Sequence, residues 1–277
     1  MNTLKASIGL TTLGISALLA SSAAWATVKA DHLSFGGNDS HCEVSLNYDV
    51  AVEPKKFVVS EADKEVYRVE LGKLYVEGKE VELDAKQQQL VSQYADEVGK
   101  QVPEVIDLVH DAVAIATTAV SMALTPLLGD AAGANVDAMM ARLSERIDDI
   151  AYQQGDRFYL GATESSIEKT FGDEFEQEME QLVQNSIGSI MMSIGSEMMN
   201  GDGGSFEEKM EAFSAKMDNV GKDIEAQLEQ QSAELENRAD KLCDNFQQLA
   251  LLESQMREAV PELESYPLMK LQGPLAK

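Results

Sequence analysis

Only a few side chains in this sequence could bind a metal or attack a substrate. The histidines are His32, His41 and His110. His32 and His41 lie near Cys42, but their spacing fits no zinc-ligand pattern, so we interpret them as surface residues. Phosphate-binding loops, nucleophile elbows, zinc-protease helices and paired CxxC motifs are absent from the sequence. The sequence therefore predicts a protein that is not an enzyme and that has no metal centre or cofactor.

Methionine is the other residue type here with ligand chemistry. Thirteen methionines occur, and four of them form a cluster, namely Met191, Met192, Met198 and Met199. Thioether sulfur binds cuprous copper, so a small-ligand or copper carrier built on this helix is the alternative function. The cluster also alternates with two isoleucines at helical spacing, where methionine fills gaps in a core. We therefore favour a core segment over a copper site.

The first residues predict an exported protein. An uncharged segment follows Lys5 and ends in Ala24-Trp25-Ala26, the small-x-small pattern that signal peptidase accepts. We expect cleavage between Ala26 and Thr27, with cleavage after Ala30 as an alternative, and a mature protein in a bacterial periplasm. A transmembrane anchor is the competing interpretation. Ser, Thr and Gly within the segment and the lack of a cationic stop behind it favour cleavage.

The two cysteines, Cys42 and Cys243, lie near the two ends of the mature chain. The periplasm oxidises thiols, and no third cysteine competes for pairing, so an internal disulfide is the simplest assignment. Two buried free thiols and a disulfide between two chains are the alternatives.

Charge limits the partners. The chain carries a formal net charge of −26, which repels nucleic acids and anionic lipid surfaces and favours cationic partners. Its apolar share of 44% is normal for a folded protein. We expect a protein partner in the periplasm, such as a cationic or unfolded client, with no nucleic acid and no stable transmembrane anchor.

Residues 27–83 are expected to form a β-rich part. Cys42, Val44, Leu46 and Tyr48 alternate with polar residues, as in a strand with one buried face. Two further apolar runs follow, and a Gly-containing turn at residues 77–80 lies between short strands, which predicts a hairpin. These segments predict a small antiparallel sheet.

Residues 84–260 are expected to be helical. Asp84 followed by Gln87 predicts a helix start, and Pro103 is expected to begin a new helix. Pro126 and Gly129 should close that second helix. A third helix is predicted from about Asn135 to Tyr152, followed by a connector.

The rest of the helical part contains two longer helices. We expect one at about 165–199 and a coiled-coil-like one at 206–259, which Pro261 stops. The last helix could pack along its own chain or form a homodimer. Residues 261–277 are expected to be a loose tail. Two uncharged segments, 112–128 and 181–196, are interpreted as central helices packed on each other, with a surface that opens for a client or lipid as the alternative.

One pattern resembles a known family. Cys42, the hairpin 72–83, Gln88, Leu90, Tyr94 and Val102-Pro103 resemble the YggN-like family of exported proteins of Gram-negative bacteria. The likeness is clearest over residues 42–125 and continues by helical pattern to about 255, and Cys243 resembles a late cysteine of the family. The resemblance implies export and an undefined function, and it supplies no catalytic residues.

The expected fold class is α+β, with an N-terminal antiparallel sheet followed by a mostly helical bundle and one long C-terminal helix. The function that fits best is that of a non-enzymatic interaction or binding protein of the cell envelope.

The mature protein begins at Thr27, because Ala24-Trp25-Ala26 ends the uncharged segment. Amino-terminal sequencing of periplasmic protein measures this directly. Protein that keeps Met1 and fractionates with the membrane would contradict the prediction.

Cys42 and Cys243 are joined in the periplasmic protein, which brings their Cα atoms within about 7 Å of each other. Peptide mapping without reduction should recover the linked pair. Reduction should lower the free energy of unfolding by up to about 5 kcal/mol, because the bridge closes a long loop. Two thiols that react with a blocking reagent in the native protein would show that this pairing is wrong.

Overall fold

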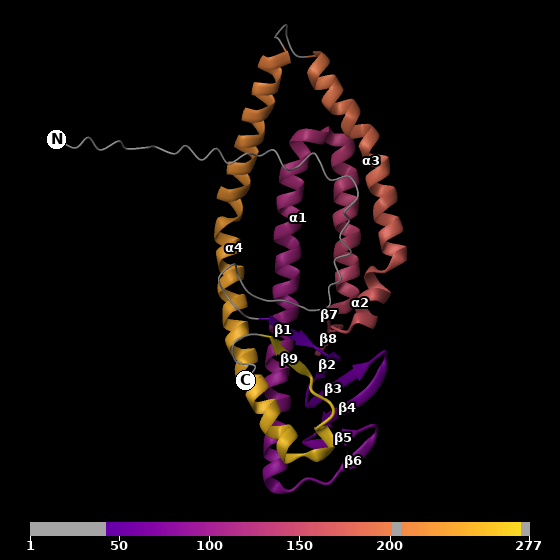
Figure 1. The fold of residues 1–277 in the computed structure, drawn as a ribbon, viewed down its shortest axis with the longest axis vertical. Coiled ribbons are helices and arrows are strands. Elements are labelled where there is room, and N and C mark those ends of the chain that lie inside the picture. Colours follow the sequence, from indigo (N-terminus) through magenta and orange to yellow (C-terminus); the bar gives the residue numbers. More distant parts are fainter. Residues whose placement is uncertain (1–42, 201–205, 273–277) are drawn as a thin grey trace, which may run out of the picture. The chain divides into compact units, whose positions relative to one another are not determined.

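The computed structural model describes residues 43–200 and 206–272, without the side chains of 125–135 and of many positions between 182 and 216. An antiparallel sheet precedes a set of helices that includes a long C-terminal one (Figure 1), so the predicted α+β class is confirmed. The described residues belong to one compact unit. The predicted signal peptide, its cleavage site, His32, His41 and Cys42 lie outside the described residues.

Seven strands form one antiparallel sheet in the order β6-β5-β4-β3-β2-β8-β7. The first five in sequence are β2 (Asp49–Glu53), β3 (Lys56–Glu61), β4 (Lys64–Glu70), β5 (Lys73–Val76) and β6 (Lys79–Val81). Glu77 and Gly78 both have positive φ, at 48° and 78°, which is the backbone that a two-residue hairpin turn requires. The hairpin predicted at this turn is confirmed.

The remaining two strands correct the sequence prediction. The segment taken as a connector forms the hairpin β7 (Ala151–Gln154) and β8 (Arg157–Leu160), and β8 pairs with β2. The third helix therefore ends at Ile150 rather than at Tyr152. The Gly155-Asp156 turn between aromatic residues was the local signal of this hairpin, and Gly155 has a φ of 62°.

Helix α1 (Ala85–Ile150) starts at the predicted cap. The Asp84 carboxylate accepts from the backbone N–H of Lys86 and Gln87, and the Gln87 side chain accepts from the Asp84 N–H. The helix continues through Pro103, so the predicted new start there is wrong. Val102, Val105 and Ile106 are buried in the core. This packing outweighs a proline penalty of about 3 kcal/mol.

Helix α1 folds back on itself between Leu124 and Val136, although its backbone is helical throughout. The Ser121 hydroxyl lies 3.5 Å from Asp137 Oδ1, whereas a straight helix would separate the two residues by about 24 Å. The two arms of the fold-back also meet at His110, whose Nε2 lies 2.7 Å from the carbonyl oxygen of Ala151, the residue that follows α1. Because a carbonyl oxygen only accepts, Nε2 is the donor in this hydrogen bond. The fold-back lies where Pro126, Gly129 and Asn135 predicted one helix to end and the next to begin.

The predicted helix at 165–199 is divided in two. Gly172 separates helix α2 (Glu164–Phe171) from helix α3 (Asp173–Asn200). Arg146 of α1 pairs with Glu178 of α3 at 3.6 Å. The start of α2 is tied to the sheet by Asp49. The carboxylate of Asp49 is 1% exposed and accepts from the N–H groups of Ala162 and Thr163 and from the hydroxyls of Thr163 and Ser166.

Helix α4 (Phe206–Ala259) has the predicted bounds and runs antiparallel to the first part of α1. Gln87 donates to the carbonyl of Ala259 at 2.7 Å, Asn245 donates to Gln101 at 3.0 Å, and Arg238 pairs with Asp111. Residue numbers thus fall along α4 as they rise along α1. The helix therefore packs along its own chain, and a homodimer through its remaining surface stays a prediction.

The segment after α4 is not a loose tail up to residue 272, which corrects that prediction. A short 3₁₀ helix (Pro261–Leu263) leads to β9 (Met269–Gln272), which pairs with β1 (Glu43–Leu46). Leu263 and Leu268 are buried. Cys243 is buried in the core, and its predicted disulfide with Cys42, which lies outside the described residues, stays a prediction.

A buried carboxylate holds this C-terminal segment to α4. Glu253 is 3% exposed and accepts from the backbone N–H groups of Leu268 and Met269. Burial raises the pKa of Glu253 from its usual 4.5 to about 7, and these two bonds and Arg257 lower it less strongly. Tyr94 of α1 lies beside it, and burial followed by the charges of Tyr67 and Glu253 raises the pKa of Tyr94 well above 10.

Stability should therefore fall as pH rises towards 7. A raised folded-state pKa means that Glu253 contributes stability fully below pH 4.5 and loses it as pH rises through 7, on the order of 3 kcal/mol at most. Urea unfolding between pH 5 and 8 should show a shallower pH dependence in Glu253→Gln than in the parent protein. The slope of the free energy of unfolding against pH is compared, rather than its absolute value, because glutamine has one acceptor oxygen instead of two and is therefore expected to change the stability at every pH.

Glu258→Gln removes an exposed carboxylate from the same helix and serves as the control, with a slope like that of the parent. Equal slopes for Glu253→Gln and the parent would show that Glu253 does not titrate in this range.

Candidate functional site

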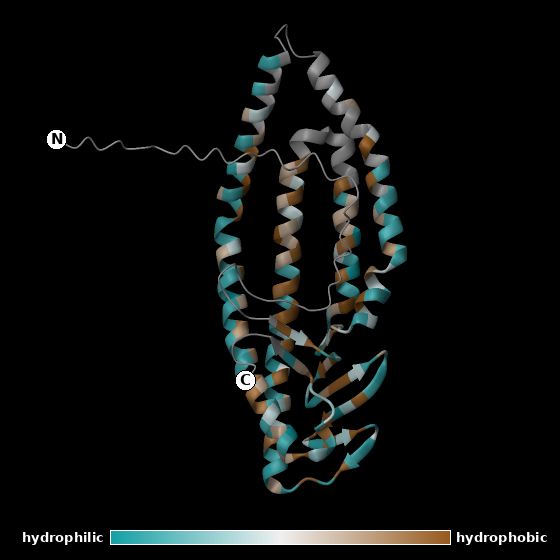
Figure 2. Cartoon of the chain, viewed as in Figure 1, coloured by the Kyte–Doolittle hydropathy of each residue, from teal (hydrophilic) through white to brown (hydrophobic). Residues whose placement is uncertain are grey.

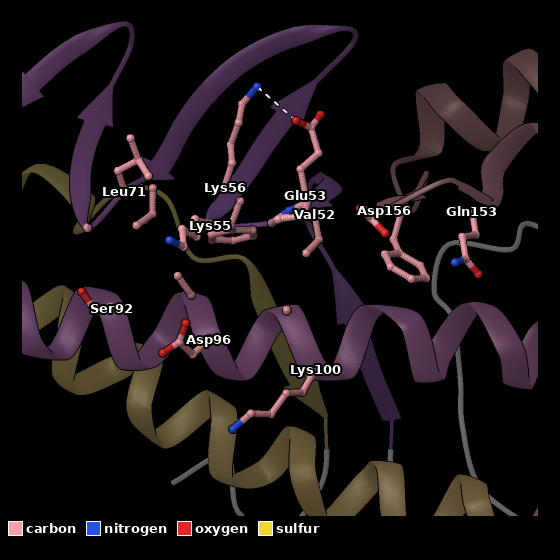
Figure 3. A pocket seen from close by; sticks show the side chains of 17 residues that line it. Val52, Glu53, Lys55, Lys56, Leu71, Ser92, Asp96, Lys100, Gln153 and Asp156 are labelled. Atoms are coloured by element: carbon pink, nitrogen blue, oxygen red, sulfur yellow. Dashed lines mark ion pairs between the residues drawn. The ribbon is translucent and has the colours of Figure 1, made fainter.

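A groove with a cavity volume of about 710 Å³ lies between the inner side of the sheet and α1 (Figure 3). Val52, Phe57 and Val69 line it from strands β2, β3 and β4, and Phe158 lines it from β8. Cavities of this size hold small ligands in many proteins. The sheet and α1 together therefore create an apolar recess large enough for a ligand.

Small residues on α1 keep the groove open. Ser92, Ala95 and Gly99 lie on the helical face that lines it. A Cβ atom on Gly99 would meet Val52 Cγ1 at 3.7 Å, an ordinary contact, so an alanine would fit there. A longer side chain at this position would extend into the groove.

Two strained turns form its rim. Leu71 and Lys55 are not glycine, yet they have positive φ values of 51° and 61°. The Leu71 N–H donates to the Lys55 carbonyl at 2.9 Å and ties the turns together. Leu71 is also 72% exposed. Leu71 and Gly72 form a two-residue hairpin turn like Glu77 and Gly78, so the hairpin itself requires the positive φ, but a leucine there is strained and its exposed side chain adds nothing to the core.

Unpaired charges face each other across the rim. Lys56 points away from α1 and pairs with Glu53 at 3.6 Å (Figure 3), and Lys100 pairs with Glu97 at 2.7 Å. Lys55, on the sheet side, and Asp96, on α1, form no ion pair within 4.0 Å among the described residues. Asp156, in the turn between β7 and β8, also lines the groove without an ion pair within 4.0 Å among the described residues. The groove therefore presents one cation and two carboxylates without ion pairs above an apolar floor.

A second surface lies on the helices beyond the sheet. Residues 112–124 of α1 carry no charge, and Thr117 and Thr118 turn their hydroxyls back to the carbonyls of Val113 and Ala114. Figure 2 shows apolar colours along this part of α1, whereas α4 is mostly hydrophilic. By length and composition alone, Ala85–Leu124 could cross a membrane, and only 17% of its most apolar 18-residue window is buried.

Helix α3 adds exposed apolar side chains. Val183, Ile187 and Met192 are 37%, 51% and 76% exposed. Ile187 lies one helical turn before Met191, at the spacing from which we predict a buried apolar stripe on this helix, so its exposure shows that the stripe does not include Ile187. The side chains of Met191, Met198 and Met199 lie outside the described ones, and the choice between a core segment and a copper site stays a prediction.

The residues singled out in the sequence do not form one site. His110 is half-buried in the α1 fold-back, Cys243 is in the core, and no cluster of three or more His, Cys, Asp or Glu that could hold a metal occurs within residues 43–200 and 206–272. Sequence reasoning missed the groove, although the spacing of Ser92, Ala95 and Gly99 on one face of α1 was a visible signal.

Comparison with known proteins identifies a family whose function is unknown. A family model described as a protein of unknown function (DUF2884) matches residues 42–269. Neither a curated protein nor a solved structure matches the chain.

Proposed function

We propose, from the premise that the chain belongs to the uncharacterised DUF2884 family, that it is a non-enzymatic binding protein of the bacterial periplasm. Its partner is an unfolded or partly folded protein segment that is apolar and cationic, and the binding surface lies on α1 and α3 beyond the sheet. A YggN-like identity and removal of residues 1–26 belong to the same proposal.

One observation carries the proposal: the most apolar part of α1 is only partly covered by its own chain, because no residue of 112–124 is buried and most of them are half-buried. Exposed apolar surface that the fold does not bury marks sites of interaction. Ile187 and Met192 of α3 are further exposed apolar side chains of the helical part.

Charge favours a cationic protein over a lipid surface. Glu225, Glu229, Glu234 and Glu236 are exposed on α4, and none of them forms an ion pair within 4.0 Å among the described residues. Arg238, by contrast, is already paired with Asp111 at the start of the apolar segment. An acidic surface repels anionic lipid headgroups and attracts basic segments. The apolar helix surface is therefore proposed as a protein-binding surface rather than a membrane anchor.

The protein should suppress aggregation of a basic unfolded client. Reduced lysozyme is basic and reduced α-lactalbumin is acidic, and light scattering follows the aggregation of each. We expect suppression of lysozyme aggregation only, weakening with added salt as charges are screened. Ile187→Ser with Met192→Ser should raise the protein concentration needed by about tenfold, because two apolar contacts are lost.

Leu251→Ser is the matched control, because Leu251 is an exposed leucine on α4, 66% exposed, outside the proposed surface. It should suppress aggregation as the parent does. Equal suppression of both clients, or no effect of the double substitution, would overturn the proposal.

A further inference from the structure

We propose that the groove between the sheet and α1 binds a single alkyl chain that carries a zwitterionic head group. This ligand site is separate from the client-binding surface on α1 and α3. The inference stands on the chemistry of the groove floor and on the charges of its rim.

The floor suits an alkyl chain better than a peptide. Strands β2, β3 and β4 lie in the interior of the sheet, so their backbone N–H and C=O groups pair with strands on both sides. The backbone groups of α1 along the groove are bonded within the helix, except the Gly99 carbonyl, because the residue four positions on is Pro103, which has no N–H. A peptide in the groove would bury amides without partners, which costs free energy, whereas an alkyl chain needs none. Val52, Phe57 and Val69 offer the apolar contacts that such a chain requires.

The rim suits a head group with both signs of charge. Lys55 attracts an anionic group from the sheet side, whereas Asp96 on α1 and Asp156 on the β7–β8 turn attract a cationic group. None of these three charges is neutralised by an ion pair within 4.0 Å among the described residues. A purely anionic ligand would also meet the net charge of −26, which repels it at long range. A zwitterion complements the rim without that cost.

The apolar tip of the β4–β5 turn completes the site. Leu71 is exposed and is bonded through its N–H to the turn that carries Lys55. A ligand that enters the groove covers Leu71 and contacts Lys55 at once. The strained backbone of both turns therefore holds the apolar contact and the charged contact at a fixed spacing before the ligand arrives.

Three amphiphiles with the same dodecyl chain test the proposal: dodecylphosphocholine, dodecyl sulfate and dodecyltrimethylammonium. Each is titrated into the purified protein below its micellar concentration and followed by calorimetry, with melting curves in parallel to confirm that the fold is kept. We expect one site for dodecylphosphocholine, about tenfold tighter than for either singly charged amphiphile. Equal affinity for all three would overturn the assignment of the head group.

Substitutions then locate the site. Gly99→Leu fills the groove and should weaken binding by at least about tenfold. Gly221→Leu places the same side chain on α4, where nothing lies within 4 Å, and should change nothing. Lys55→Met leaves the core intact and should shift the preference towards the cationic amphiphile, and Asp96→Asn should shift it towards the anionic one.

Two results would refute the site even if an amphiphile binds. One is unchanged affinity in Gly99→Leu with an unchanged melting curve. The other is displacement of dodecylphosphocholine by tri-leucine at an equal or lower concentration, which would assign the groove to a peptide. Ile187→Ser with Met192→Ser should leave amphiphile binding unchanged, which separates this proposal from that of client binding.

Discussion

The apolar inner face of the seven-stranded sheet has to be covered, and the first part of α1 covers it. Val91, Tyr94 and Val98 of α1 are at most 2% exposed and share one core with Phe57 and Tyr67 of the sheet. The Phe57 ring meets both tyrosine rings edge-on, with centroids 5.8 Å and 6.0 Å away. Because α1 is fixed here, its register with α4, and with it the position of the C-terminal strand, is fixed as well.

Features carried by neighbouring residues could be predicted from the sequence. The capping box at Asp84, the Glu77-Gly78 turn and the bounds of α4 each depend on a few adjacent residues, and all three are confirmed. The β7–β8 hairpin and β9 join strands far away in the sequence, so their pairing leaves only a weak local signal. Asp49 shows the same limit, since its four hydrogen bonds reach residues more than a hundred positions away.

The candidate groove escaped prediction for a related reason. Its floor comes from four strands and its other wall from a helix, so no continuous segment contains it. The helical face with Ser92, Ala95 and Gly99 shows small residues, but small residues on a helix more often allow close packing than an opening. Whether this face of α1 packs closely or leaves an opening depends on how far away the opposite wall lies, which Val52 and Phe158 help to form. Strain at Leu71 is equally hidden, because a leucine in a sequence predicts neither exposure nor a positive φ.

The sheet and the distal helices differ in how much of their apolar surface the chain itself buries. Around the sheet, the strands and the first part of α1 leave a recess of about 710 Å³, whose size favours a small ligand. Beyond the sheet, α1 folds back, and the exposed Glu234 of α4 lines the same pocket as Ala114 and Ile115 of its uncharged segment. A long helix continues past the sheet that anchors it only if other contacts support it, because isolated helices are marginal in water. The fold-back supplies such contacts, because Val136 and Met140 are buried against Val120 and Leu124. It still leaves part of the apolar surface of α1 exposed, and this surface is not needed for the core around the sheet.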